Sequence, residues 1–113
     1  MKAIFVELPP FRRVRENYLA DDEYRALQVE LMGNPEAGDV IKGTGGLRKL
    51  RFGDKRRGKG KRGGLRVIYY YWVKGPEFWF FTLYGKDEMD DLSEAGREAF
   101  SELLRDVLRL VDR

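Results

Sequence analysis

The side chains best suited to chemistry lie in the segment 43–66, where cations are interleaved with glycine. This segment contains ten lysines and arginines and the single acid Asp54, so its charge is +9, while the rest of the chain sums to −6. Such a dense cationic strip favours a polyanionic partner, and nucleic acid is the first candidate. Because glycine lets the backbone approach a phosphate chain closely, six cations of the strip are predicted to contact it: Lys55, Arg56, Arg57, Lys59, Lys61 and Arg62.

The absent residue types exclude several kinds of site. The chain has no cysteine and no histidine, which removes thiolate nucleophiles, cysteine-based metal sites and the usual general base. The strip matches the start of a phosphate-binding P-loop, but a strand follows it, and Gly60 stands where serine or threonine would bind Mg²⁺. Four acids within 87–91 precede a predicted helix, so capping its positive end is favoured over metal binding. No metal and no cofactor is therefore predicted.

Hydrophobic spacing and turn residues predict the elements that must position these side chains. Strands are expected at 3–8, 47–52, 65–74 and 77–84, a loop at 38–46, and helices at 11–19, from Asp21 or Asp22 to Gly33, and from 90–93 to about 111. The order β-α-α-β-β-β-α predicts an α+β fold, a small, mostly antiparallel twisted sheet with a helical hairpin and a C-terminal helix. We expect the helices to cover one face of the sheet, and the chain to form one domain, 1–113.

Strand alternation predicts where the cations gather. Lys49 and Arg51 share one side of their strand, and Arg66 and Tyr84 have the matching parity in theirs, with Lys86 just beyond. These side chains are therefore expected to converge on the open face of the sheet. Most aromatic residues of the strands are predicted to be core, and Tyr70 or Tyr84 remains available to stack on a base.

The segment that carries the cations, together with the strand that follows, resembles the RelE/HigB superfamily of toxins from bacterial toxin–antitoxin pairs, closest to the HigB branch. The residues that carry the resemblance are GTGGLRKLRFGDKRRGKGKRGGLRVIYYYW and FFTLYGKDEMDDL, and residues 5–41 fit the same pattern. The resemblance implies a RelE-like fold and a ribosome-dependent endoribonuclease that cuts mRNA. It also implies a cognate antitoxin, often with a helix-turn-helix domain.

The resemblance also implies roles for single residues. Lys49, Arg51 and Arg66 match the positions that face the scissile phosphate, and Lys86 is the nearest match to a further cation. The family's C-terminal tyrosine or histidine is missing after Lys86, and Tyr84 is the candidate substitute. RNA is then cut without metal when its 2′-hydroxyl attacks the adjacent phosphate. Arg66 would hold the phosphate oxygens, while Lys49, Lys86 or Tyr84 would transfer protons.

Three alternatives to a nuclease are open. A non-catalytic RNA- or ribosome-binding module would need the basic face alone, and a relative that has lost activity would look the same in sequence. A DNA-binding module is less favoured because no recognition helix is basic: the positive charge of the strip lies on a loop and strands. The longest apolar run, Val67 to Val73, is too short to span a bilayer, so a cytoplasmic protein without membrane contact is expected.

Overall fold

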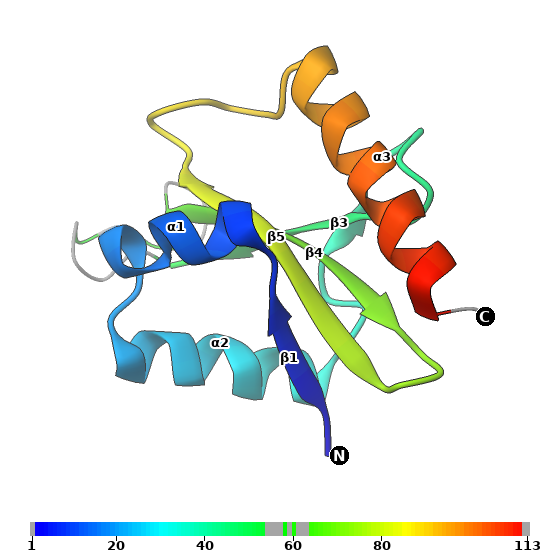
Figure 1. Ribbon diagram of the computed structural model, residues 1–113. Helices are drawn as coiled ribbons and strands as arrows, with labels where there is room; N and C mark the ends of the chain where they lie inside the picture. The colour runs from blue at the N-terminus through cyan, green and yellow to red at the C-terminus, as the bar shows by residue number, and fades with distance from the viewer. Residues whose placement is uncertain (1, 54–57, 59, 61–63, 112–113) are drawn as a thin grey trace.

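The computed structural model describes residues 2–53, 58, 60 and 64–111, which form one sheet with helices on both of its faces (Figure 1). The order along the chain is β1 (Ile4–Glu7), α1 (Pro9–Tyr18), α2 (Asp21–Gly33), β2 (Asp39–Val40), β3 (Arg48–Phe52), β4 (Leu65–Trp72), β5 (Glu77–Gly85) and α3 (Glu94–Val111). The strands lie in the order β1-β5-β4-β3-β2, and every pair is antiparallel except β1 with β5. The predicted α+β class is confirmed, and the predicted element order agrees with the structure apart from the short strand β2.

The short strand β2 is the element that sequence reasoning missed. Its two residues lie inside the predicted loop 38–46 and pair with Arg48 and Lys49 of β3. Two residues cannot show the alternation by which a strand is recognised. Because β2 is so short, residues 50–52 of β3 have no strand on that side within the described part of the chain.

The helix starts follow from local chemistry. Pro9 and Pro10 begin α1, because proline lacks only an N–H that the first turn leaves unpaired. The predicted cap of α2 at Asp21 or Asp22 is wrong: Ala20 is the N-cap, and its N–H donates to the Glu23 carboxylate at 3.0 Å. At α3, the Ser93 hydroxyl accepts the Gly96 N–H at 3.0 Å, which caps the helix.

The sheet is covered on both faces, so the expectation of helices on one face is wrong. The first core joins α1 and α2 to one face through Phe11, Leu27 and Leu31. The second core joins α3 to the other face, where Leu104 packs with Trp79 and its neighbours. The aromatic strands β4 and β5 carry apolar side chains on both faces, and each face therefore requires its own cover. No helix in the described ranges is long and apolar enough to cross a membrane.

A bulge in β5 sets the direction of its last side chains. Ile68 pairs with Thr82 while Tyr69 pairs with Phe80, so Phe81 is an extra residue in β5. The bulge changes the alternation, and Tyr84 consequently lies in the same core cluster as Phe81, on the α3 face. The bulge therefore places the Tyr84 side chain on the face that also carries Lys49.

Candidate nucleic-acid interface

Three predicted site residues form a row across the middle of the sheet. Arg51 of β3 pairs with Arg66 of β4, and Arg66 pairs with Tyr84 of β5. Lys49 stands in the next row of the same face, opposite Ile68. Directly paired residues project to the same face, and neighbouring strands are about 4.8 Å apart, so the row spans about 10 Å. Strand register therefore places Lys49, Arg51, Arg66 and Tyr84 on one face of the sheet, as predicted.

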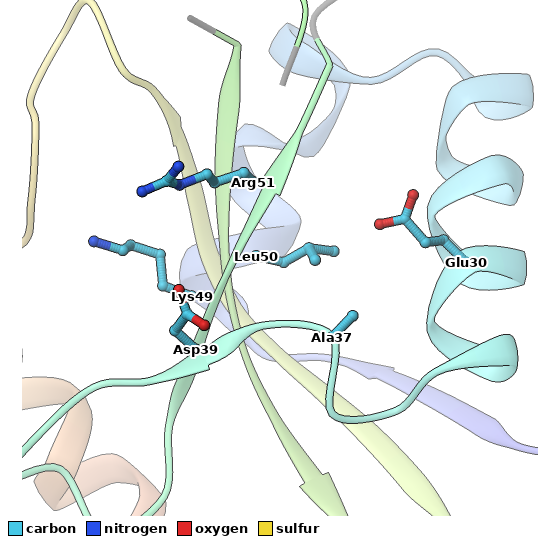
Figure 2. A pocket seen from close by; sticks show the side chains of 6 residues that line it. All are labelled: Glu30, Ala37, Asp39, Lys49, Leu50 and Arg51. Atoms are coloured by element: carbon cyan, nitrogen blue, oxygen red, sulfur yellow. The ribbon is translucent and has the colours of Figure 1, made fainter. Parts of the chain in front are cut away.

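Arg51 is the most accessible residue of this row, and Lys49 lies two residues earlier on the same strand. Figure 2 shows Lys49 and Arg51 extending from one side of β3, while Leu50 extends from the other side toward α2. A shallow pocket of about 310 Å³ lies along β3 and is also lined by Glu30 of α2 and Asp39 of β2. Arg51 is exposed, and no described residue forms an ion pair or hydrogen bond with its guanidinium. Arg51 is thus positioned to meet a ligand first.

The other two residues of the row, Arg66 and Tyr84, are buried and do not lie on an open surface. Arg66 and Tyr84 each expose only 3% of their surface, so the expectation of an open face is wrong for these two residues. The Arg66 guanidinium donates a hydrogen bond to the Leu65 carbonyl at 3.2 Å. A phosphate can therefore contact Arg51 directly, whereas it reaches Arg66 only after neighbouring groups move.

The connection between β5 and α3, residues 86–93, partly explains this burial; we call it the acidic connection. Asp91 Oδ1 lies 2.9 Å from Lys49 Nζ, in an ion pair whose lysine side chain is 22% exposed. Leu92 anchors the connection by packing into the α3-face core. The hydrogen bond from Lys49 holds the pKa of Asp91 below its usual value, so this carboxylate stays charged near neutral pH. Asp91 therefore neutralises the cation that was predicted to face the phosphate.

For Glu88 and Asp91, the predicted role as caps of α3 is wrong, because both carboxylates bond other partners. Glu88 accepts the Gly85 N–H at 3.0 Å and also accepts a hydrogen bond from the Tyr18 hydroxyl of α1. Asp91 binds Lys49 instead of the helix. No group of three or more acids among the described residues is arranged to hold a metal ion.

Tyr84 is held in its protonated form. Burial raises the pKa of the Tyr84 phenol to about 12; nearby Asp91 adds to the rise, and Arg66 opposes it. The hydroxyl has no hydrogen-bond partner among the described residues. A phenol with this pKa can donate a proton near neutral pH but cannot serve there as a base.

The remaining predicted residues differ in what the structure says of them. The Lys86 N–H donates to the Gly64 carbonyl at 2.9 Å, which places Lys86 beside the start of β4. Tyr70 packs against Trp79 with ring centroids 5.3 Å apart, on the α3 face. The six cations of the strip that were predicted to contact RNA lie outside the described residues: Lys55, Arg56, Arg57, Lys59, Lys61 and Arg62.

Sequence reasoning missed the contribution of the acidic connection to this site. Asp91 and Glu88 were treated as helix-capping acids because they precede α3 in the chain. One signal was present: the body of the protein carries a net charge of −6 outside the strip, so some cations could find acids within the chain. Which acid meets which cation depends on where Leu92 packs, and periodicity does not contain that information.

Comparison with known proteins supports the fold. No family model matches the chain. Among solved structures, the chain is similar to the isolated E. coli RelE toxin, with 14% identity, a TM-score of 0.52, and coverage of 88% of this chain and 97% of that one. A double arginine-to-alanine mutant of the E. coli toxin in its free state gives 14% identity, a TM-score of 0.51, and coverage of 80% and 90%. The protein therefore has a RelE-like fold, as predicted.

Proposed function

We propose that this protein is a toxin of the RelE/HigB type, closest to HigB, that cleaves mRNA on the ribosome and thereby inhibits translation. One observation carries the proposal: on a RelE-like fold, register places Lys49, Arg51, Arg66 and Tyr84 on one face of the sheet. Cations on a rigid sheet can stabilise the charge that a phosphate develops during transfer. The substrate, the ribosome and a cognate antitoxin, of the helix-turn-helix class, would be cytoplasmic partners.

The proposed reaction needs no metal, because the RNA supplies its own nucleophile. The 2′-oxygen forms a bond to phosphorus as the bond to the 5′-oxygen breaks, leaving a 2′,3′-cyclic phosphate and a 5′-hydroxyl. Arg51 binds the phosphate oxygens first, and Arg66 adds positive charge from the next strand. The burial and high pKa of Tyr84 favour it as the acid that protonates the leaving 5′-oxygen. Lys86 would take the 2′-hydroxyl proton, while Lys49 stays an ammonium that pairs first with Asp91 and then with the phosphate.

This assignment requires the acidic connection to yield. The Asp91 carboxylate lies 2.9 Å from the ammonium of Lys49. A phosphate oxygen that bound Lys49 would take the place of this carboxylate. The incoming phosphate replaces one anion by another, so the lysine need not become an unpaired cation at any stage. Binding to the ribosome would supply the energy for this exchange through the cationic strip.

The test is inducible expression in a bacterium, with primer extension on one abundant mRNA. Wild type should arrest growth and produce new in-frame cuts. Arg51→Ala should lose the cuts while melting at the wild-type temperature, because Arg51 is exposed and bonds no described residue. Glu102→Ala, on the exposed surface of α3, is the control and should behave as wild type. Retained cleavage in folded Arg51→Ala would remove the row from the active site.

A non-catalytic RNA- or ribosome-binding module remains the second candidate, favoured by the near-complete burial of Arg66 and Tyr84. That alternative predicts ribosome binding without arrest and without cuts in the message. The same experiment separates the two functions, because only a nuclease generates new ends.

A further inference from the structure

A second cavity, of about 330 Å³, lies between α1 and α3, beside the row formed by Arg51, Arg66 and Tyr84. The parallel pairing of β1 with β5 ends at Phe80, so no described strand covers the last five residues of β5 on that side. The acidic connection passes from this end of β5 to the start of α3 (Figure 1). Six of the residues that line the cavity are Val14, Tyr18, Tyr84, Glu88, Leu92 and Phe100.

The cavity combines apolar and aromatic walls with two polar groups that have unused hydrogen-bonding capacity. The Tyr84 hydroxyl is buried and bonds no described residue. Both hydrogen bonds to Glu88, from Gly85 and from Tyr18, end on Oε1, and within the described ranges Oε2 accepts none. A small site with apolar walls and a few directed polar groups is typical of a ligand pocket. Its ligand should be flat and should present hydrogen-bond donors to a carboxylate.

The distance between the cavity and the row of Arg51, Arg66 and Tyr84 matches the size of a nucleotide. Tyr84 belongs to both the cavity wall and the row, so Arg66 is about one strand spacing away and Arg51 about two, or about 10 Å. A single nucleotide, with its phosphate on the row, can place its base in the cavity. Proteins that read single-stranded RNA hold bases in this way, against aromatic side chains and polar groups at the base edge.

We propose that this cavity holds the base next to the phosphate on the row, and that Glu88 selects bases that carry an exocyclic amino group. The inference rests on the proposed function and adds its base preference. A carboxylate only accepts hydrogen bonds, so it pairs with the amino group of cytosine and meets a carbonyl oxygen at the same place in uracil.

The test compares cytidine 3′-monophosphate with uridine 3′-monophosphate, two ligands of the same shape and charge, by calorimetry or NMR titration. Wild type should bind the cytidine nucleotide roughly tenfold more tightly. Glu88→Gln should reverse the preference, because its amide oxygen keeps the Gly85 N–H and its NH₂ group then donates to the uracil carbonyl. Glu102→Gln, an exposed α3 substitution outside the cavity lining, should keep the wild-type preference.

Three results would overturn the inference: equal affinities in the wild type, no measurable binding of either nucleotide, or a cytidine preference that survives in Glu88→Gln. The wild-type comparison is decisive even where the variant does not fold. Selective nucleotide binding by a protein that cuts no message would support the cavity and remove the nuclease, so the two proposals fail separately.

Discussion

Asp91→Asn should strengthen RNA binding, because it removes the carboxylate that competes with phosphate for Lys49. The Lys49 side chain is 22% exposed and that of Asp91 is 54% exposed, so the pair is partly solvated and its worth is discounted accordingly. Ion pairs of this kind contribute about 0.5–1 kcal/mol. Losing the competitor should therefore improve affinity for a non-cleavable RNA by roughly two- to fivefold. The melting temperature should fall by about 2–6 °C.

Salt and pH give the same prediction two further signatures. The gain in affinity should shrink as ionic strength rises, because the pair is partly exposed and screened. The folded-state pKa of Asp91 is lowered, so its contribution to stability is present above the unfolded value and is lost as pH falls through the folded one. Wild type and Asp91→Asn should consequently become equally stable in acid.

The assay is fluorescence anisotropy with a 2′-O-methyl RNA, alongside thermal melts. Asp90→Asn is the matched control, because it makes the same charge change one residue earlier, at an exposed acid without a partner among the described residues. Equal effects of the two substitutions would show that overall charge, and not the contact with Lys49, governs binding. Unchanged affinity in Asp91→Asn would refute the competition.

Three further predictions concern Tyr84, the cationic strip and the core under α3. Tyr84→Phe should slow cleavage about 100-fold. It should keep or raise the melting temperature, because it removes a buried hydroxyl that has no partner among the described residues. Slower cleavage together with a lower melting temperature would point to misfolding. Neutralising Lys59, Lys61 and Arg62 together should reduce the slope of log affinity against log salt on single-stranded RNA by about 2, and an unchanged slope would exclude them from contact. Leu104→Ala should destabilise the fold by about 2–5 kcal/mol in urea titrations, because Leu104 is 1% exposed in the core under α3; a loss under 1 kcal/mol would contradict that packing.

The sequence was sufficient for every element except the two-residue strand β2, and for the shared face of Lys49, Arg51 and Arg66, because these depend on local periods. The alternation of Lys49, Leu50 and Arg51 correctly assigned two faces of β3. The predicted strand 65–74 contains the central strand β4, which ends two residues earlier. Tyr84 was assigned to the right face although the bulge at Phe81 shifts the parity of β5. The alternation of a strand carries no information about such an extra residue, so alternation alone does not predict the face of Tyr84.

What could not be predicted depends on packing between distant segments. The stripe at Phe100, Leu103 and Leu104 shows that α3 has an apolar face, but not which side of the sheet it covers. The burial of Arg66 and the pairing of Asp91 with Lys49 follow from the path of the acidic connection. That path is fixed by tertiary contacts which no local pattern in the sequence encodes.

The most direct test of the central claim is the chemistry of the RNA ends made by the purified protein on ribosomes that carry a defined mRNA. The account predicts cleavage only when ribosomes are present, with a 2′,3′-cyclic phosphate on one product and a 5′-hydroxyl on the other, and no products with Arg51→Ala. Intact mRNA from folded wild-type protein that binds the ribosome would contradict the nuclease and leave the binding module. Products with a 5′-phosphate would contradict the 2′-hydroxyl mechanism.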